Sequence, residues 1–440
     1  MKLKELLKDI TVLKSNADME LDIQEIFYDS RKVQPGDLFV AITGFASDGN
    51  RFIPMAMEKG AVAVVTAKRP VEAVPYILVE NDRLALALIG RNFYDAPAVS
   101  MTLIGVTGTN GKTSVTWLLK QVLEEVTGCK AGLIGTMENR IGDQVIPTER
   151  TTPESFELQG LFARMRDAGC RYAIMEVSSH AIALHRVGGV HFDVAAFTNL
   201  TEDHLDFHKT MEAYCDTKAE LFARCGKAVL NRDDSWFERM RQQASCPVVT
   251  TSVKGQADLY ATDVELLSDG IRFTAVSDGK ETAIRLPIPG RFTVYNVLTV
   301  LGIVKALGIE LEAAAKALEK VQGVKGRVEV VPTPGKPYTV LIDYAHTPDG
   351  LENVLSSVKG FCKGRLIAVF GCGGDRNRPR ALMGETAGKF ADFTIITSDN
   401  PRSEDPESIV RDIEKGIIPT GADYICIVDR REAIEYALKN

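Results

Sequence analysis

The sequence is short of several features that define large classes of protein. It contains no run of roughly 18 apolar residues and its N-terminus has no apolar signal region, so we expect neither a membrane span nor a secretory signal. The 52 Lys and Arg residues are outnumbered by 59 Asp and Glu residues, and the net charge of −7 argues against a nucleic-acid-binding protein. We therefore expect a cytoplasmic protein, and this charge balance still allows a local basic pocket for a phosphorylated small molecule.

Paired or clustered cysteines are also missing. The chain has eight cysteines, yet none form a Cys-x-x-Cys pair or a Cys/His cluster with the spacing of a zinc site. Reduced thiols are the expectation.

Internal repeats and low-complexity stretches are absent as well, and 440 residues are too many for one ordinary hydrophobic core. Several domains are therefore predicted.

The order of apolar runs predicts three successive α/β domains, 1–99, 100–325 and 326–440. Strand-type and helical runs alternate in each of them. The expected strands are 37–42, 61–66, 76–79, 101–106, 172–177, 194–198, 228–230, 339–343, 365–370, 393–397 and 424–428. The expected helices of the first two domains are 50–59, 83–93, 114–126, 294–307 and 311–318. Because helices separate the central strands, we expect a parallel sheet there, and alternation over 258–286 predicts an appended antiparallel hairpin.

A glycine-rich segment, Gly108-Thr-Asn-Gly-Lys-Thr113, follows the first central strand and precedes a helix. Glycines allow backbone N–H groups to approach phosphates, and the helix N-terminus adds partial positive charge. Lys112 would contact the terminal phosphates and Thr113 a magnesium ion. The strict phosphate-loop pattern requires Gly where this chain has Val106, and the alternative interpretation is an ordinary turn with a helix cap. We favour a nucleoside triphosphate site.

Acidic and histidine residues gather after this loop. Glu176 ends a predicted strand, which places its carboxylate at the ligand-binding edge of a parallel sheet. Several of the six histidines, among them His180, His185, His204 and His208, follow within a few tens of residues. Each histidine taken alone is an ordinary surface or core residue, but their density together with nearby carboxylates predicts a site that includes a divalent metal ion.

Taken together, these motifs resemble the Mur ligases of peptidoglycan synthesis. The resemblance extends over residues of about 25 to 430, and the motifs occur in the family's order. They are 107–113, Glu176-Val-Ser-Ser-His180, 198–206, Asp343-Tyr-Ala-His346 and Asn400-Pro-Arg402. Residues 151–153, 343–349 and 371–376 are typical of the member that adds the third amino acid of the peptide. The implied fold has a small domain for the UDP-linked sugar, a central ATPase-like parallel-sheet domain and a C-terminal Rossmann-like domain for the amino acid.

The resemblance also implies roles for individual residues. ATP and Mg²⁺ are the implied cofactors, and four residues carry the catalytic roles: Lys112, Glu176, His204 and Lys218. Thr113, Glu176, His204 and Lys218 would hold the metal, with Lys218 carbamylated so that a cation becomes a carboxylate-like ligand. Without the resemblance, Lys218 would be taken for a solvated helix lysine. The implied ATP-binding residues are Gly108, Thr109, Asn110, Gly111, Lys112, Thr113, Asn296, Arg327, Asp343 and His346.

The remaining implied residues belong to the two other substrates. Ser30, together with residues 44–49, would contact UDP, and the muramoyl-dipeptide would be held by Thr151, Thr152, Ser178 and Arg186. The incoming amino acid would be received by Arg376, Asp399, Asn400 and Arg402. Two arginines suit a substrate with a distal carboxylate. In this family Asp-Asn-Pro-Arg accompanies meso-diaminopimelate, whereas lysine-adding members lack that Arg.

The implied reaction joins meso-diaminopimelate to the D-Glu carboxylate of UDP-MurNAc-L-Ala-D-Glu through an acyl phosphate. The alternatives are lysine addition, a folylpolyglutamate-type ligase, and a catalytically silent nucleotide-binding protein. We expect a monomer. Related synthetases continue into a Gly-Lys-Gly-His-Glu loop that is absent from this sequence, so we also expect the C-terminal domain and its amino-acid site to be incomplete.

Overall fold

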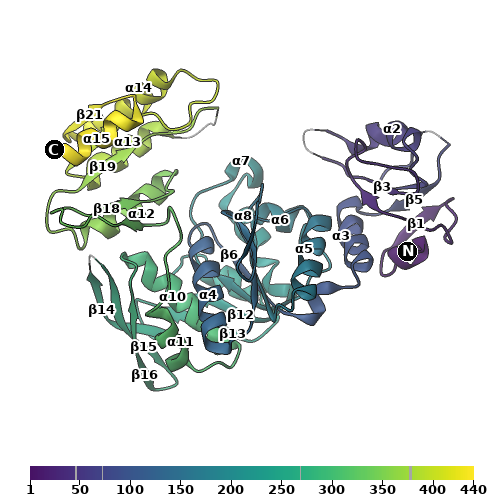
Figure 1. Ribbon diagram of the computed structural model, residues 1–440, viewed down its shortest axis with the longest axis horizontal. Helices are drawn as coiled ribbons and strands as arrows, with labels where there is room; N and C mark the ends of the chain where they lie inside the picture. The colour runs from purple at the N-terminus through teal and green to yellow at the C-terminus, as the bar shows by residue number, and fades with distance from the viewer. Residues whose placement is uncertain (45–46, 72, 268, 376–378) are drawn as a thin grey trace.

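The computed structural model describes residues 1–44, 47–71, 73–267, 269–375 and 379–440. Three α/β sections follow one another along the chain, from purple through teal and green to yellow (Figure 1). No disulfide joins any of the described cysteines. None of the described helices is long and apolar enough to cross a membrane.

The first section is a five-stranded sheet in the order β1-β5-β4-β3-β2, in which only β1 is antiparallel to its neighbour. Apolar side chains from strands and helices fill its core, because β3, β4 and β5 are rich in Val, Ile and Leu. Its elements are α1 Leu3–Leu6, β1 Val12–Ser15, β2 Ile26–Phe27, β3 Leu38–Ala41, η1 Gly49–Phe52, α2 Ile53–Glu58, β4 Ala63–Thr66, β5 Tyr76–Val79 and α3 Asp82–Phe93.

The central section contains an eleven-stranded sheet in the order β16-β15-β14-β13-β12-β11-β6-β10-β7-β8-β9. Strands β7, β10, β6, β11, β12, β13 and β14 are parallel, and apolar cores cover both faces of this region. Its strands are β6 Thr102–Thr107, β7 Ala131–Ile134, β8 Asn139–Ile141, β9 Gln144–Ile146, β10 Tyr172–Glu176, β11 Phe192–Phe197, β12 Cys225–Asn231, β13 Val248–Ser252, β14 Leu259–Leu267, β15 Gly270–Ser277 and β16 Lys280–Leu286.

Helices flank this sheet on both sides (Figure 1). They are η2 Pro97–Ser100, α4 Lys112–Thr127, α5 Ser155–Asp167, α6 Ser179–Ala183, α7 Leu205–His208, α8 Met211–Ala219, η3 Phe222–Arg224, α9 Phe237–Gln243, α10 Arg291–Ala306 and α11 Leu311–Leu318. The prediction of a single hairpin over 258–286 was wrong. The segment forms three antiparallel strands, because Leu259, Phe273 and Ile284 all contribute to one core beneath the helices.

The third section has two separate small sheets. Strands β17 and β18 form an antiparallel pair, whereas β19, β20 and β21 form a parallel sheet. The strand predicted at 339–343 thus exists as β18, but it does not join the parallel sheet that follows it. The elements are β17 Glu329–Val331, β18 Val340–Ile342, α12 Pro348–Lys359, β19 Ile367–Phe370, α13 Arg380–Phe390, β20 Phe393–Ile396, α14 Pro406–Ile417, η4 Ile418–Thr420, β21 Tyr424–Cys426 and α15 Arg430–Lys439.

Candidate functional site

The candidate site lies where three neighbouring parallel strands end. β6 pairs with β10 on one side and with β11 on the other, so the segments that follow these strands meet at one edge. The glycine-rich loop follows β6, Glu176 ends β10, and Thr198 follows β11. Ligands of open α/β sheets bind at the carboxyl ends of the strands.

The loop between β6 and α4 can be formed only with glycine at two positions. Gly108 has φ 145°, and a Cβ there would lie 1.9 Å from Thr198 Oγ1. Gly111 has φ 85°, and its Cβ would lie 2.5 Å from Asn296 Oδ1. Lys112 Nζ bends back over the loop and donates to the carbonyls of Gly108 and Thr109, both at 2.9 Å. Burial lowers the pKa of Lys112, because it disfavours the charged amine.

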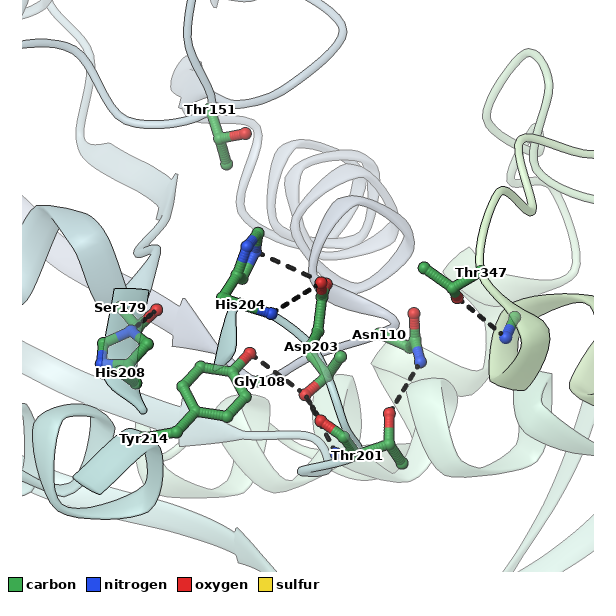
Figure 2. A network of polar contacts seen from close by, with 12 residues as sticks. Gly108, Asn110, Thr151, Ser179, Thr201, Asp203, His204, His208, Tyr214 and Thr347 are labelled. Carbon is green, nitrogen blue, oxygen red and sulfur yellow. Dashed lines mark hydrogen bonds and ion pairs between the residues drawn. The ribbon is translucent and has the colours of Figure 1, made fainter. Parts of the chain in front are cut away.

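The segment after β11 supports the loop from beneath. Thr198 Oγ1 donates to the Asn110 carbonyl at 2.6 Å, and Asn199 Oδ1 accepts from Asn110 N at 2.9 Å. The Thr109 hydroxyl lies 3.2 Å from the hydroxyl of Tyr214 (Figure 2). Sequence reasoning assigned no role to Asn199 or Tyr214, although Asn199 lies inside the motif at 198–206. These contacts fix the loop's conformation before any ligand is bound.

Glu176 connects the loop to the opposite wall of the site. Its buried carboxylate accepts from Thr113 Oγ1 at 3.0 Å and from the N–H and hydroxyl of Thr136 at 2.8 and 3.0 Å. A hydroxyl and a carboxylate are oxygen ligands of the kind that Mg²⁺ accepts beside phosphates and water. Nothing in the sequence marked Thr136, which lies just after β7.

Lys218 is a buried amine without an acidic partner among the ion pairs of the described residues. Only 1% of the residue is exposed, and Nζ donates to the Gly108 carbonyl at 3.0 Å while lying 4.7 Å from the centre of the Tyr214 ring. Burial, followed by repulsion from Lys112, lowers the pKa of Lys218 well below its usual value. A solvated helix lysine is thereby excluded at this position.

Three of the clustered histidines come together beside Lys218. His180 lies 4.8 Å from His204 and 5.7 Å from His208 between ring centres, and His208 Nε2 lies 2.8 Å from Ser179 Oγ (Figure 2). Burial lowers the pKa of His208 to about 4 and also lowers those of His180 and His204. Within the described residues no three His, Cys, Asp or Glu side chains are placed to hold an ion alone. A metal here would need ligands from a bound nucleotide.

A pocket opens next to the loop, at the N-terminal end of α4 and α10. Its lining combines apolar side chains with the polar groups of Asn296 and Arg327: Ser114, Leu118, Ile288, Phe292, Thr293, Asn296, Val324 and Arg327. Arg327 Nε is buried without a hydrogen-bond partner in the described structure. Such a lining has the character of a site for a flat aromatic base.

The third section reaches the loop through Asp349, in the first turn of α12. Its carboxylate accepts from Asn110 Nδ2 at 2.8 Å and from Thr201 Oγ1 at 2.9 Å. Asp343 and His346 instead contact the backbone of the third section: Asp343 accepts from the N–H groups of Val328 and Ala345, and His346 Nδ1 lies 2.8 Å from the Tyr344 carbonyl. Burial raises the pKa of Asp343.

The predicted dipeptide residues lie on the Glu176 side of the site. Thr152 Oγ1 donates to the Glu176 carbonyl at 2.9 Å and lies 3.4 Å from Ser178 Oγ. Thr151 Oγ1 is 3.0 Å from the Thr136 hydroxyl, and Arg186 Nη1 donates to the Thr152 carbonyl at 3.2 Å. Ser30 does not belong to this network; it is buried in the first section beside Met55.

Three predicted amino-acid residues, Asp399, Asn400 and Arg402, follow β20. Arg402, with φ 51°, donates to the Gly374 carbonyl at 3.0 Å, and Gly374 N donates to the Asn400 carbonyl at 2.9 Å. Asp399 lies 3.6 Å from Arg430. Arg376 lies outside the described residues, as do two positions of the predicted UDP segment 44–49.

Models of known protein families match most of the chain. The Mur ligase family catalytic domain matches 22–94, the Mur ligase middle domain 106–304 and the Mur ligase glutamate ligase domain 326–440. The chain belongs to the Mur ligase family.

Individual relatives agree with these family models. A UDP-N-acetylmuramoyl-L-alanyl-D-glutamate–2,6-diaminopimelate ligase from Caldanaerobacter subterraneus is 49% identical, over 100% of this chain and 91% of its own length. The enzyme of the same name from Clostridium tetani is 46% identical with the same coverage. A solved structure of a ligase of this name superposes with a TM-score of 0.76 at 32% identity, over 99% of this chain and 90% of that one.

The predictions of the Mur ligase family and its three-part α/β fold are therefore confirmed. The structure of this Mur ligase brings Lys112, Thr113, Glu176, His204 and Lys218 to one sheet edge. It places Asn296 and Arg327 in the neighbouring pocket, whereas Ser30 and Arg402 lie in other sections. The roles of these residues and the domain boundaries at 99 and 325 stay predictions.

We expect Gly108→Ala to lower the free energy of unfolding by about 1–3 kcal/mol, because it adds backbone strain and a clash with Thr198. Gly128→Ala is the matched control: Gly128 also has positive φ, +67°, but nothing lies within 4 Å of its added Cβ. Gly128→Ala should lower the free energy of unfolding by only about 1 kcal/mol. Denaturant unfolding of the three proteins measures both effects, and equal losses in the two variants would contradict the proposed clash.

Proposed function

We propose that this Mur ligase uses ATP to join meso-diaminopimelate to the D-Glu carboxylate of UDP-MurNAc-L-Ala-D-Glu in peptidoglycan precursor synthesis. The observation that carries the proposal is the hydrogen bond from Thr113 to Glu176, which connects a phosphate-binding loop to the wall bearing Thr152 and Ser178. The shared name of the relatives at 46–49% identity over the whole chain supports the substrates.

The reaction has two steps. A D-Glu carboxylate oxygen attacks the γ-phosphorus of ATP, the bond to the β-phosphate oxygen breaks, and ADP leaves an acyl phosphate behind. The amine of diaminopimelate then attacks the acyl carbon, the carbon–oxygen bond breaks, phosphate leaves, and the nitrogen gives up a proton. Neither step requires a covalent bond to the protein, so its contribution is positioning and charge neutralisation.

Several residues suit the nucleotide. The pocket containing Asn296 and Arg327 would take the adenine, and the N–H groups at the start of α4 together with Lys112 would face the phosphates. Mg²⁺, when bound, would neutralise phosphate charge, and Thr113 and Glu176 offer suitable oxygen ligands. His204, whose side chain is half exposed and lies 3.5 Å from Asp203, would be a further metal ligand, as the family resemblance implies.

Lys218 suits carbamylation. Carbon dioxide reacts with the neutral form of an amine, and the lowered pKa of Lys218 favours that form. Two buried amines, Lys112 and Lys218, both donate to the Gly108 carbonyl. A carbamate at Lys218 would put a negative charge beside Lys112 and provide oxygen ligands for a metal ion.

We expect Lys112→Ala to abolish phosphate release, because no other side chain supplies the lost charge at the loop. Thermal melting should stay close to that of the parent protein. Turnover at the parent rate in a normally folded variant would exclude Lys112 from the ATP site.

Lys218→Ala should be inactive and should recover part of its activity in short-chain carboxylic acids, which can imitate a carbamate beside the metal. Lys316→Ala, in the exposed part of α11, is the control and should be fully active without the acid. A high-resolution density map with nucleotide and a bare amine at Lys218 would contradict this role.

Arg402→Ala should lower kcat/KM for diaminopimelate by about 100-fold, because it removes a charge-assisted bond to the distal carboxylate. The KM for ATP should hardly change.

Parallel assays of the parent with diaminopimelate and lysine test the substrate itself. Preference for lysine would overturn the assignment of diaminopimelate and favour the lysine-adding alternative.

A further inference from the structure

Three arginines surround one carboxylate where the first section meets the central one. Glu154, at the N-cap of α5, lies 3.5 Å from Arg83 Nη1, 3.7 Å from Arg150 Nη1 and 3.3 Å from Arg186 Nε. Arg83 comes from α3 of the first section, and α3 lies beside α5 (Figure 1). We name these four residues the arginine cluster.

The arginine cluster has more positive charge than its own carboxylate can balance. Three guanidinium groups face one carboxylate, and 8% of the Glu154 side chain is exposed, against 16% for Arg83 and 15% for Arg186. Arg83 Nη1 and Arg186 Nε are buried, and the acceptor that they face is Glu154, at 3.5 and 3.3 Å, outside hydrogen-bond geometry. One carboxylate cannot satisfy three guanidinium groups, so the cluster has donors left for an acceptor that arrives from outside.

Solvent has access to the cluster at Arg150, whose side chain is 53% exposed. An incoming anion would therefore meet an exposed arginine first and the two more buried ones behind it. Guanidinium groups bind carboxylate and phosphate oxygens in pairs, so the cluster suits either chemistry.

A short series of contacts runs from the arginine cluster to the phosphate loop. Arg186 donates to the Thr152 carbonyl, Thr152 donates to the Glu176 carbonyl, and the Glu176 carboxylate accepts from Thr113. The cluster is thus connected to the wall that bears Thr152 and Ser178, to which the proposed function assigns the acceptor dipeptide.

We propose that Arg83 and Arg150 act with Arg186 as a specificity site for an anionic group of the acceptor nucleotide, a carboxylate or its diphosphate. The inference rests on the proposed function; the family resemblance implies a role in dipeptide binding for Arg186 but none for Arg83 or Arg150. Because Arg83 belongs to the first section, an anion bound here would also join the two sections across the α3–α5 contact.

Arg83→Met tests the inference in the full chain. The dissociation constant for UDP-MurNAc-L-Ala-D-Glu should rise by about 10-fold or more, in line with a lost charge-assisted bond, while the KM for ATP stays unchanged. Arg83→Lys keeps the charge but loses the paired N–H groups of the guanidinium. Its dissociation constant should lie between those of Arg83→Met and the parent. Arg150→Met should weaken binding in the same direction.

Two matched controls separate substrate binding from simple packing. Arg91, also on α3, pairs with the exposed Asp9 at 2.7 Å, and Arg166 on α5 joins the two sections by donating to the Tyr94 carbonyl at 2.9 Å. Neither Arg91→Met nor Arg166→Met should alter binding of the acceptor. An equal loss in Arg166→Met would show that the section contact, not the arginine cluster, is responsible, and would overturn the inference.

Calorimetry with two nucleotides identifies the anion. If Arg83→Met loses affinity for UDP-MurNAc-L-Ala-D-Glu but not for UDP-GlcNAc, which has the diphosphate and no carboxylate, the bound group is a carboxylate; equal losses identify the diphosphate. Unchanged affinity in a folded Arg83→Met protein, with normal binding by the parent, overturns the inference alone. A parent protein that binds neither nucleotide contradicts the proposed function as well.

Discussion

The parallel pairing of β6 with β10 and β11 sets the position of every polar group in the central site. It brings the phosphate loop, Glu176 and the Thr198–Asn199 segment to one edge of the sheet, although they are far apart along the chain. Buried backbone hydrogen bonds and apolar cores on both faces hold this alignment. A shift in register between β6 and β10 would separate Thr113 from Glu176.

Buried positive charge is the second constraint on this molecule. Lys112 and Lys218 both donate to one carbonyl, and the arginine cluster gathers three guanidinium groups at one carboxylate. Protein interiors do not tolerate charge without compensation, so such places favour anionic ligands.

Polar side chains connect neighbouring sections. Asp349 connects the third section to Asn110 and Thr201, and Tyr28 donates to Glu157 at 2.5 Å between the first and central sections. Catalysis by closure of the sections would exclude water from an acyl phosphate, which hydrolyses readily. The small number of polar contacts at Asp349 is compatible with such movement, because few bonds need to break.

The sequence by itself determined the order of the sections, most of the strands and the phosphate loop, since these depend on apolar periodicity and on glycine. It also supplied the motifs that identify the family. It did not reveal Thr136, Asn199, Tyr214 or Asp349, because their roles arise from residues that are neighbours only after the sheet has formed. The third strand at 258–286 was missed because periodicity marks strands but not their number. Only the tertiary structure decided that Lys218 is buried and that Arg83 and Arg186 both lie beside Glu154. Burial and charge balance depend on which distant segments pack together.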